Sequence, residues 1–116
     1  FLGWEPHPMN SKLKMVYLKG ADQYFGPNQG SSTVFINTRK NYSQDCPEVA
    51  HFLNNFKMTI EMENALMSMI LDQKLDPKVA AQKWIKDHSK SVQSWMSGVK
   101  SHDGQLGYEV VRKKLL

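Results

Sequence analysis

The hydrophobic pattern of this chain changes its period near residue 38, and this change limits the folds that the chain can adopt. Before it, apolar residues stand in short runs rich in β-branched and aromatic side chains, of which TVFINT at residues 33–38 is the densest. Such runs predict buried strands. After it, apolar residues recur every three or four positions, which predicts amphipathic helices. Strands followed by a helix-rich half indicate part of an α/β protein.

Two more strands are expected near the start of the chain. Residues 1–4 (FLGW) form one, which ends before Pro6 and Pro8 because proline cannot donate a hydrogen bond to a sheet. Residues 15–18 (MVYL) form the other. Residues 20–32 are rich in glycine, proline and asparagine, so a crossover loop is expected there. Its glycines lack the G-K-[S/T] ending of a phosphate-binding loop.

The second part of the chain is expected to form helices. Pro47 suits the first turn of the first of them. Thr59 is a good N-cap for the second, which carries Glu61 and Glu63 in its first turn. The expected helices are residues 47–56, a helix that follows Thr59, a helix that begins near Asp76 and Pro77, residues 91–99 and residues 108–116.

Composition excludes several classes of protein. With 116 residues and 13.3 kDa, the chain has room for one compact domain. Its 41% hydrophobic and 22% charged residues are typical of a globular protein, not of a disordered or fibrous one. The net charge of +4 is spread along the chain, without the basic stripe and interleaved aromatics of a nucleic-acid-binding module. Because apolar residues run from Phe1 straight into a motif, we expect the C-terminal piece of a longer protein.

No catalytic residue, metal ligand or cofactor-binding loop is predicted. The single cysteine, Cys46, cannot close a disulfide within the chain, and no activating base marks it as a nucleophile. The histidines have no metal-binding spacing such as H-E-x-x-H. They are His7, His51, His88 and His102.

The segment GWEPHPMN, residues 3–10, has the composition of a binding site. Indole is the aromatic ring that attracts a cation most strongly, and a quaternary ammonium cannot donate an N–H bond, so aromatic faces are its natural receptor. Trp4 is therefore a candidate ligand-binding residue, although a core position at the end of a strand is the alternative. His7 is the second candidate because Pro6 and Pro8 fix the backbone around it, which lowers the ordering cost of binding.

The same segment resembles the signature of substrate-binding proteins of choline and glycine-betaine ABC importers. Four further stretches look like the corresponding segments of the choline-binding branch. They are YLKGADQYFGPNQGSSTVFINTR, CPEVAHFLNNFKMTIEMENALMSMIL, DPKVAAQKWIKDH and WMSGV. The resemblance covers essentially all of the chain.

The resemblance implies a two-lobed, type II periplasmic-binding-protein fold that closes on its ligand. Residues 1–14 would supply the end of the second lobe, the ligand-site loop and the crossover, and residues 15–116 the C-terminal part of the first lobe. Trp4 matches the motif tryptophan, one wall of an aromatic box around the trimethylammonium group. His7 matches the motif histidine, whose neighbourhood helps to hold the ligand carboxylate in betaine-binding relatives.

The implied function is that of a periplasmic or otherwise extracytoplasmic receptor that captures choline or a related quaternary ammonium compound. Its partners would be the ligand, the membrane permease of the ABC importer and the N-terminal part of the same protein, with no cofactor and no nucleic acid. In that oxidising compartment Cys46 would pair with a cysteine near the mature N-terminus.

Other functions remain open at this point. One is a receptor for glycine betaine or proline betaine, and another is the ligand-sensing domain of a regulator. A third is a small α/β enzyme in which Glu5 and His7 perform acid–base chemistry. The enzyme is disfavoured because no nucleophile, metal set or cofactor loop accompanies this pair.

Overall fold

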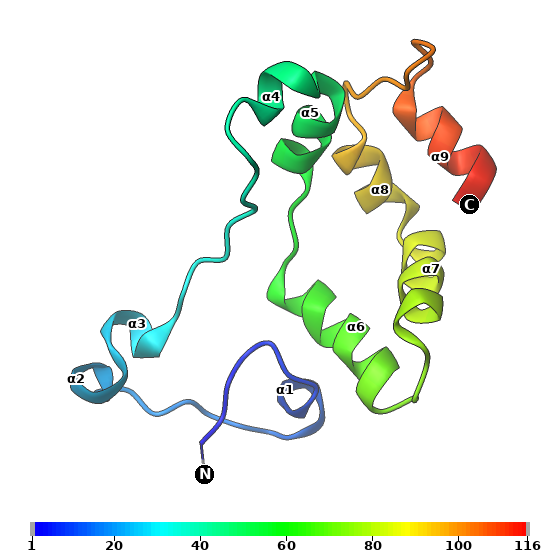
Figure 1. The fold of residues 1–116 in the computed structure, drawn as a ribbon. Coiled ribbons are helices and arrows are strands. Elements are labelled where there is room, and N and C mark those ends of the chain that lie inside the picture. The colour runs from blue at the N-terminus through cyan, green and yellow to red at the C-terminus, as the bar shows by residue number, and fades with distance from the viewer. Residues whose placement is uncertain (1, 116) are drawn as a thin grey trace.

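The computed structural model describes residues 2–115, which form nine helices (Figure 1). The helices are α1 (Met9–Lys12), α2 (Asp22–Phe25), α3 (Pro27–Gly30), α4 (Tyr42–Asp45), α5 (Pro47–Asn55), α6 (Ile60–Leu71), α7 (Pro77–Asp87), α8 (Ser89–Trp95) and α9 (Gly107–Leu115). Within this range the only β-pairing is an isolated antiparallel bridge between Lys100 and Leu106. No helix among residues 2–115 combines the length and apolar character that a membrane crossing requires.

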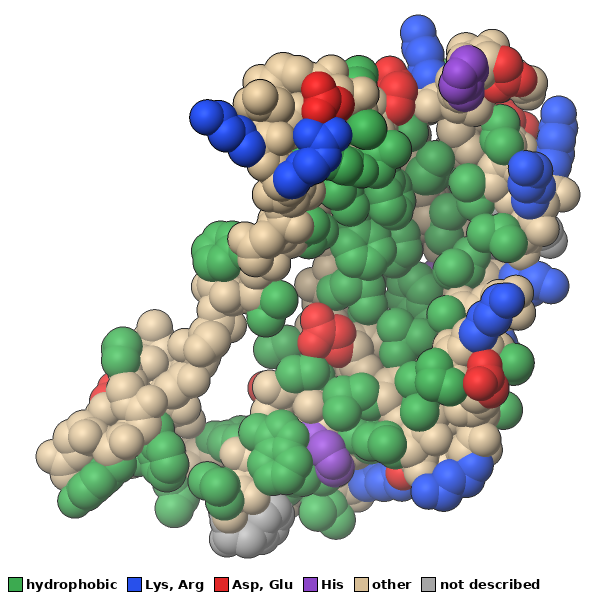
Figure 2. Space-filling model, viewed as in Figure 1, with side chains coloured by type: hydrophobic (Ala, Val, Ile, Leu, Met, Phe, Trp, Pro, Cys, Tyr) green, Lys and Arg blue, Asp and Glu red, His purple; other side chains and the backbone are tan. Residues whose placement is uncertain are grey.

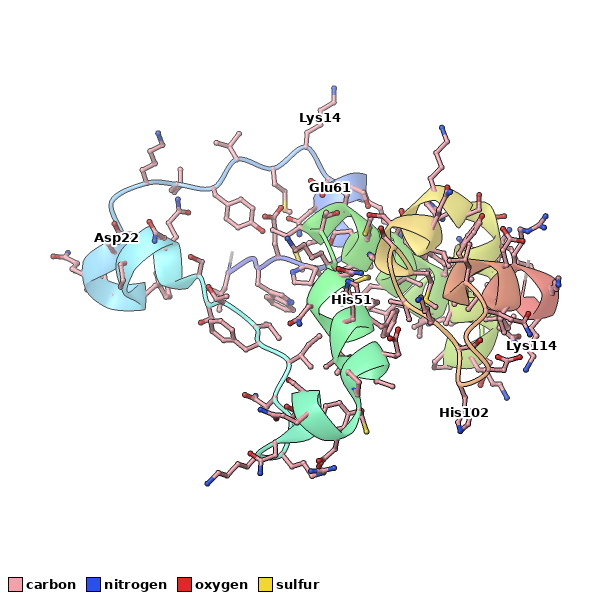
Figure 3. All side chains as sticks on the ribbon, turned by 90° about the horizontal axis from the view of Figure 1, so that it is seen from above. Lys14, Asp22, His51, Glu61, His102 and Lys114 are labelled. Atoms are coloured by element: carbon pink, nitrogen blue, oxygen red, sulfur yellow. The ribbon has the colours of Figure 1, made fainter. Side chains whose placement is uncertain are left out.

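The chain is drawn out rather than globular. Its radius of gyration is 17.9 Å and its extents are 53 × 35 × 21 Å, whereas a compact domain of this length has a radius of gyration of about 13 Å. Figure 1 shows an N-terminal arm, residues 2–38, whose last part is an extended segment that leads into a helical body, residues 39–115. Figure 3 places Lys14 and Asp22 on the arm, and His102 and Lys114 at the far end of the body.

The hydrophobic core lies in the helical body. Its buried residues come from α6, α7 and α8, and they are Met69, Ala80, Trp84, Val92 and Trp95. Hydrophobic side chains gather over this part of the molecule in Figure 2. Each large side chain that is buried here stabilises the fold by about 1.5–3 kcal/mol, so the body carries the stability of the chain.

A row of neighbouring aromatic rings crosses this core. The ring of Phe56 lies 4.7 Å from that of Trp95, and Trp95 stacks on Trp84 at 5.6 Å. Trp84 in turn stacks on His88, with ring centroids 4.1 Å apart and planes inclined by 5°. Such pairs contribute about 0.5–1.5 kcal/mol each beyond their burial. The row therefore joins α5, α7 and α8 into one unit.

The expected helix starts at Thr59 and Asp76 are confirmed. Thr59 Oγ1 accepts a hydrogen bond from the backbone amide of Met62 at 3.3 Å. Asp76 Oδ1 accepts from the amides of Lys78 and Val79, at 2.9 and 3.3 Å. These bonds satisfy donors that the first turn of a helix leaves without partners. Local sequence therefore fixes the first residues of α6 and α7.

Two helix boundaries differ from expectation. The helix expected at residues 91–99 is α8, which runs from Ser89 to Trp95. It stops early because Gly98 adopts a left-handed backbone with φ of +71° close behind it, a conformation that ends helices. The helix expected at 108–116 is α9, and Leu116 lies outside the described residues.

The three expected strands are corrected by the structure. Residues 2–4, 15–18 and 33–38 are extended, but no β-ladder forms along them, and Phe1 lies outside the described range. Nor is the third segment buried, since Val34 is 93% and Phe35 73% exposed. A strand exists only when a neighbour accepts and donates its backbone hydrogen bonds. Within residues 2–115 these segments have no such neighbour.

Four short helices were not expected. Each of α1 to α4 has four residues, and α2 and α3 lie in the segment expected to be a plain crossover loop. A single turn contains too few residues to show a 3.6-residue period, so pattern analysis cannot detect it. The backbone of α3 is left-handed at Asn28 and Gln29, which makes it a turn rather than a regular helix.

Candidate functional site

The GWEPHPMN segment forms a tight loop that leads into α1. The backbone amide of Asn10 donates to the carbonyl of His7 at 3.0 Å, and that of Ser11 to the carbonyl of Pro8 at 3.2 Å. Pro8 is buried, and the Glu5–Pro6 peptide bond is cis. We call residues 3–10 the ligand loop.

Trp4 presents its indole to solvent. It is 54% exposed, whereas the other two tryptophans of the chain, Trp84 and Trp95, are 3% and 9% exposed in the core. The ring of Trp4 meets that of His7 edge to face, with centroids 5.2 Å apart and planes at 67°. Among residues 2–115 Trp4 is therefore not a core residue. It is the one indole in this range with a face free for a ligand.

His7 has a defined tautomer in this loop. The backbone amide of Met9 lies 3.2 Å from His7 Nδ1. Because an amide can only donate, Nδ1 accepts this bond, and the neutral ring carries its hydrogen on Nε2. His7 can thus offer an N–H donor at Nε2 beside the indole of Trp4.

Two residues that sequence analysis did not select hold the ligand loop together. The side-chain amide of Asn10 donates to the backbone carbonyls of Trp4 and His7, at 2.9 and 3.1 Å. Its oxygen accepts a bond from the Tyr17 hydroxyl at 2.8 Å. Contacts across six and seven residues follow no helical or strand period, so no pattern in the sequence indicated them. The one signal in the sequence for Asn10 was its place at the end of the GWEPHPMN segment.

An ion pair joins the end of α1 to the helical body. Lys12 Nζ lies 2.6 Å from a carboxylate oxygen of Asp72, the residue that follows α6. Ser68 Oγ also donates to this carboxylate, at 2.7 Å. The bond from Lys12 and then the bond from Ser68 hold the pKa of Asp72 below its ordinary value. The charged pair thus fixes where α1, directly after the ligand loop, meets the body.

A separate cavity of about 520 Å³ opens between α6 and α7. Asn64, Ser68, Trp84 and His88 contribute to its wall, and Trp4 and His7 do not. Trp84 is the aromatic ring that could hold a cation there, but it is already stacked in parallel on His88 and on Trp95. Because Trp84 is only 3% exposed, it offers this cavity little open π-face for a quaternary ammonium.

The side chains of the ligand loop have groups suited to recognising a ligand. An exposed indole attracts a cation, and an adjacent imidazole N–H can meet an acceptor group on the same molecule. No group of three or more histidine, cysteine, aspartate or glutamate side chains that could hold a metal ion occurs within residues 2–115.

A family model described as the substrate-binding domain of ABC-type glycine betaine transport systems matches residues 1–87. The chain belongs to this family. The match includes the ligand loop and continues through α7, so it covers the arm and most of the core.

Known proteins give the same assignment. The glycine betaine/carnitine transport binding protein of Listeria monocytogenes serotype 1/2a (strain 10403S) is 33% identical over 102 residues, which are 88% of this chain and 33% of that protein. The solved structure of an ABC-transporter choline binding protein in complex with choline is 45% identical, with a TM-score of 0.84. The matched region covers 98% of this chain and 39% of the choline binding protein. The chain thus spans about a third to two fifths of the length of these relatives.

A second solved structure, of an ABC-transporter choline binding protein in an unliganded semi-closed conformation, has the same 45% identity but a TM-score of 0.76. Because the sequence identity is equal in the two comparisons, the difference in TM-score reflects the arrangement of the chain. The backbone of the present chain is therefore arranged more like that of the choline complex than like that of the unliganded structure.

Proposed function

We propose that this chain is part of a two-lobed extracytoplasmic receptor that captures choline, or a closely related quaternary ammonium compound, for an ABC importer. The observation that carries the proposal is the exposed indole of Trp4 on a loop fixed by hydrogen bonds. A trimethylammonium group needs such a face because it cannot donate a hydrogen bond. The choline complex among the related structures supports this ligand class.

In the proposed receptor the fold is of the type II periplasmic-binding-protein kind. Residues 1–14 end the second lobe and carry the ligand loop and the crossover, and residues 15–116 form the C-terminal part of the first lobe. The extended segments 15–18 and 33–38 enter α/β sheets whose other strands belong to the rest of the receptor. Their exposed apolar side chains support this placement, since burial against neighbouring strands would remove them from water.

A single indole does not make a binding site. Its cation–π attraction is about 0.5–2 kcal/mol, which is below the cost of associating two molecules. The remaining aromatic walls and the polar partners of the ligand therefore come from the rest of the receptor. A membrane permease then takes the ligand from the closed receptor.

A betaine ligand is the second candidate, and His7 is the observation that favours it. The Nε2–H group of His7 lies on the ring that contacts Trp4, and a betaine carboxylate would accept a bond from it. Choline has no carboxylate and offers this donor only the oxygen of its neutral hydroxyl group. The relative from Listeria, whose name includes glycine betaine and carnitine, supports the betaine alternative.

Titration calorimetry on the full-length receptor tests the proposal. Choline, glycine betaine and 3,3-dimethylbutanol are compared, since the last has the shape of choline without its charge. We expect the neutral analogue to bind at least about thirtyfold more weakly than choline, because a cation–π site loses about 2 kcal/mol without the charge. Equal binding of choline and its neutral analogue, or no binding of either choline or glycine betaine, would contradict the proposal.

A further inference from the structure

We propose that Asn10 and Tyr17 form a clamp that positions Trp4 and His7 for the ligand. This inference rests on the proposed function, because it concerns the same site. Neither clamp residue needs to touch the ligand, so both act as positioning residues.

The side-chain amide of Asn10 is the centre of the clamp. Its nitrogen donates to the carbonyl of Trp4 at 2.9 Å and to the carbonyl of His7 at 3.1 Å. An amide nitrogen carries two hydrogens, which suffice for both bonds. Because these carbonyls belong to the two candidate ligand residues themselves, one planar group sets the distance and orientation between them.

Tyr17 holds that amide from the following segment of the chain. Its hydroxyl donates to Asn10 Oδ1 at 2.8 Å, which fixes which side of the amide carries the oxygen. Its ring also lies against Gly3, where an added Cβ would stand 3.5 Å from the ring and from the hydroxyl oxygen. Tyr17 thus bonds to Asn10, which orients Trp4, and lies close to Gly3, the residue before Trp4.

The ligand loop depends on these contacts because the other bonds that hold it are local, or lie after its last residue at Lys12. Its buried residue is Pro8, and α1 is only one turn long. A helix of four residues has too few internal hydrogen bonds to be stable alone. When binding groups are already ordered in the free receptor, the ordering cost is not subtracted from affinity. Loosening the clamp should therefore weaken binding while leaving the core intact.

Two substitutions remove the clamp with little change in shape. Asn10→Asp places a carboxylate, which can only accept, opposite the carbonyls of Trp4 and His7. Tyr17→Phe removes the hydroxyl and keeps the ring over Gly3. The matched controls are Asn54→Asp, at an exposed position on α5, and Tyr24→Phe, whose ring is 78% exposed.

The variants are made in the full-length receptor labelled with 5-fluorotryptophan. We expect Asn10→Asp, which loses two hydrogen bonds, to weaken choline binding about tenfold. Tyr17→Phe loses one hydrogen bond and should weaken it about threefold. In the ligand-free receptor the ¹⁹F resonance of Trp4, assigned with Trp4→Phe, should shift or broaden in both variants. The resonances of Trp84 and Trp95 should stay in place, because these rings belong to the core.

The outcomes separate this inference from the proposed function. If the unsubstituted receptor binds no quaternary ammonium compound, the proposed function fails, and the Trp4 resonance still decides whether the clamp exists. If the receptor binds choline and both variants keep its affinity and the Trp4 resonance, the clamp is overturned. If Asn10→Asp does not fold, Tyr17→Phe alone decides, since it leaves every backbone contact in place.

Discussion

The ammonium group of Lys12 lies 2.6 Å from the carboxylate of Asp72, so α1 is tied to the end of α6 directly after the ligand loop. The two side chains are 60 residues apart in the sequence and belong to the arm and the body. The side chains are 55% and 28% exposed, so solvent screens the pair. Its contribution to stability is therefore small, and its main role is to fix geometry.

The ion pair should make stability depend on pH in acid. The pKa of Asp72 is lowered, first by the bond from Lys12 and then by that from Ser68. A carboxyl group with a lowered pKa stabilises the fold above its ordinary pKa, and this contribution is lost as the pH falls through the folded-state value. Thermal unfolding of the receptor and of Lys12→Gln should therefore differ at pH 7, and the difference should shrink below about pH 4. A difference that stays constant from pH 7 to pH 3 would count against the assignment.

Trp4→Ala should weaken ligand binding without unfolding the receptor. Removing the exposed indole takes one wall from the proposed cation site and should cost about 2 kcal/mol or more, or about thirtyfold in Kd. Trp4→Phe should lose less, because a smaller π-face remains. Calorimetry and thermal unfolding on the same samples check both effects. A large loss of stability with unchanged affinity in the folded fraction would show that Trp4 is a core residue.

Trp84→Ala should lower the stability of the fold, in contrast to Trp4→Ala, which should lower ligand affinity. Trp84 is 3% exposed and stacks on both His88 and Trp95, so its loss leaves a cavity in the core. The expected cost is about 3–5 kcal/mol of folding free energy. Denaturant unfolding measures it, with Trp4→Ala as the matched tryptophan control. If the two substitutions destabilised the receptor equally, the distinction between core and site would be wrong.

The isolated 116 residues should bind choline very weakly or not at all. One indole contributes about 0.5–2 kcal/mol, which is less than association costs. Calorimetry on the isolated chain, with the full-length receptor as the positive control, checks this. Micromolar affinity of the isolated chain would mean that the other walls of the box are not needed.

Cys46 should be oxidised in the proposed receptor. It is half-buried at the residue before α5, and the chain offers no second cysteine. In an oxidising compartment an unpaired cysteine is expected to find a partner elsewhere in the protein. Mass mapping under non-reducing conditions, with Cys46→Ser as the control, should find it joined to a cysteine outside these residues. A free Cys46 thiol in the natively exported receptor would contradict this.

Much of the helical body follows from local sequence. The helix starts at Thr59 and Asp76 are set by side chains that bind amides two or three residues away, so the sequence contains the whole interaction. The position of α5 follows in the same way from Pro47 at its first residue. The two candidate ligand residues, Trp4 and His7, could also be named from sequence because their chemistry and their proline neighbours are local features.

Tertiary structure decided how these pieces are used. Residues 33–38 have the composition of a buried strand, but a strand also needs a partner, and none of the residues from 2 to 115 supplies one. Local sequence marked Trp4 as a candidate but left a core position open, and packing decided that Trp4 is exposed and Trp84 buried. The bonds from Asn10 to Trp4 and from Tyr17 to Asn10 likewise depend on how the chain turns back on itself. Composition and periodicity describe what neighbours along the chain can do, whereas contacts between distant residues exist only once the chain has folded.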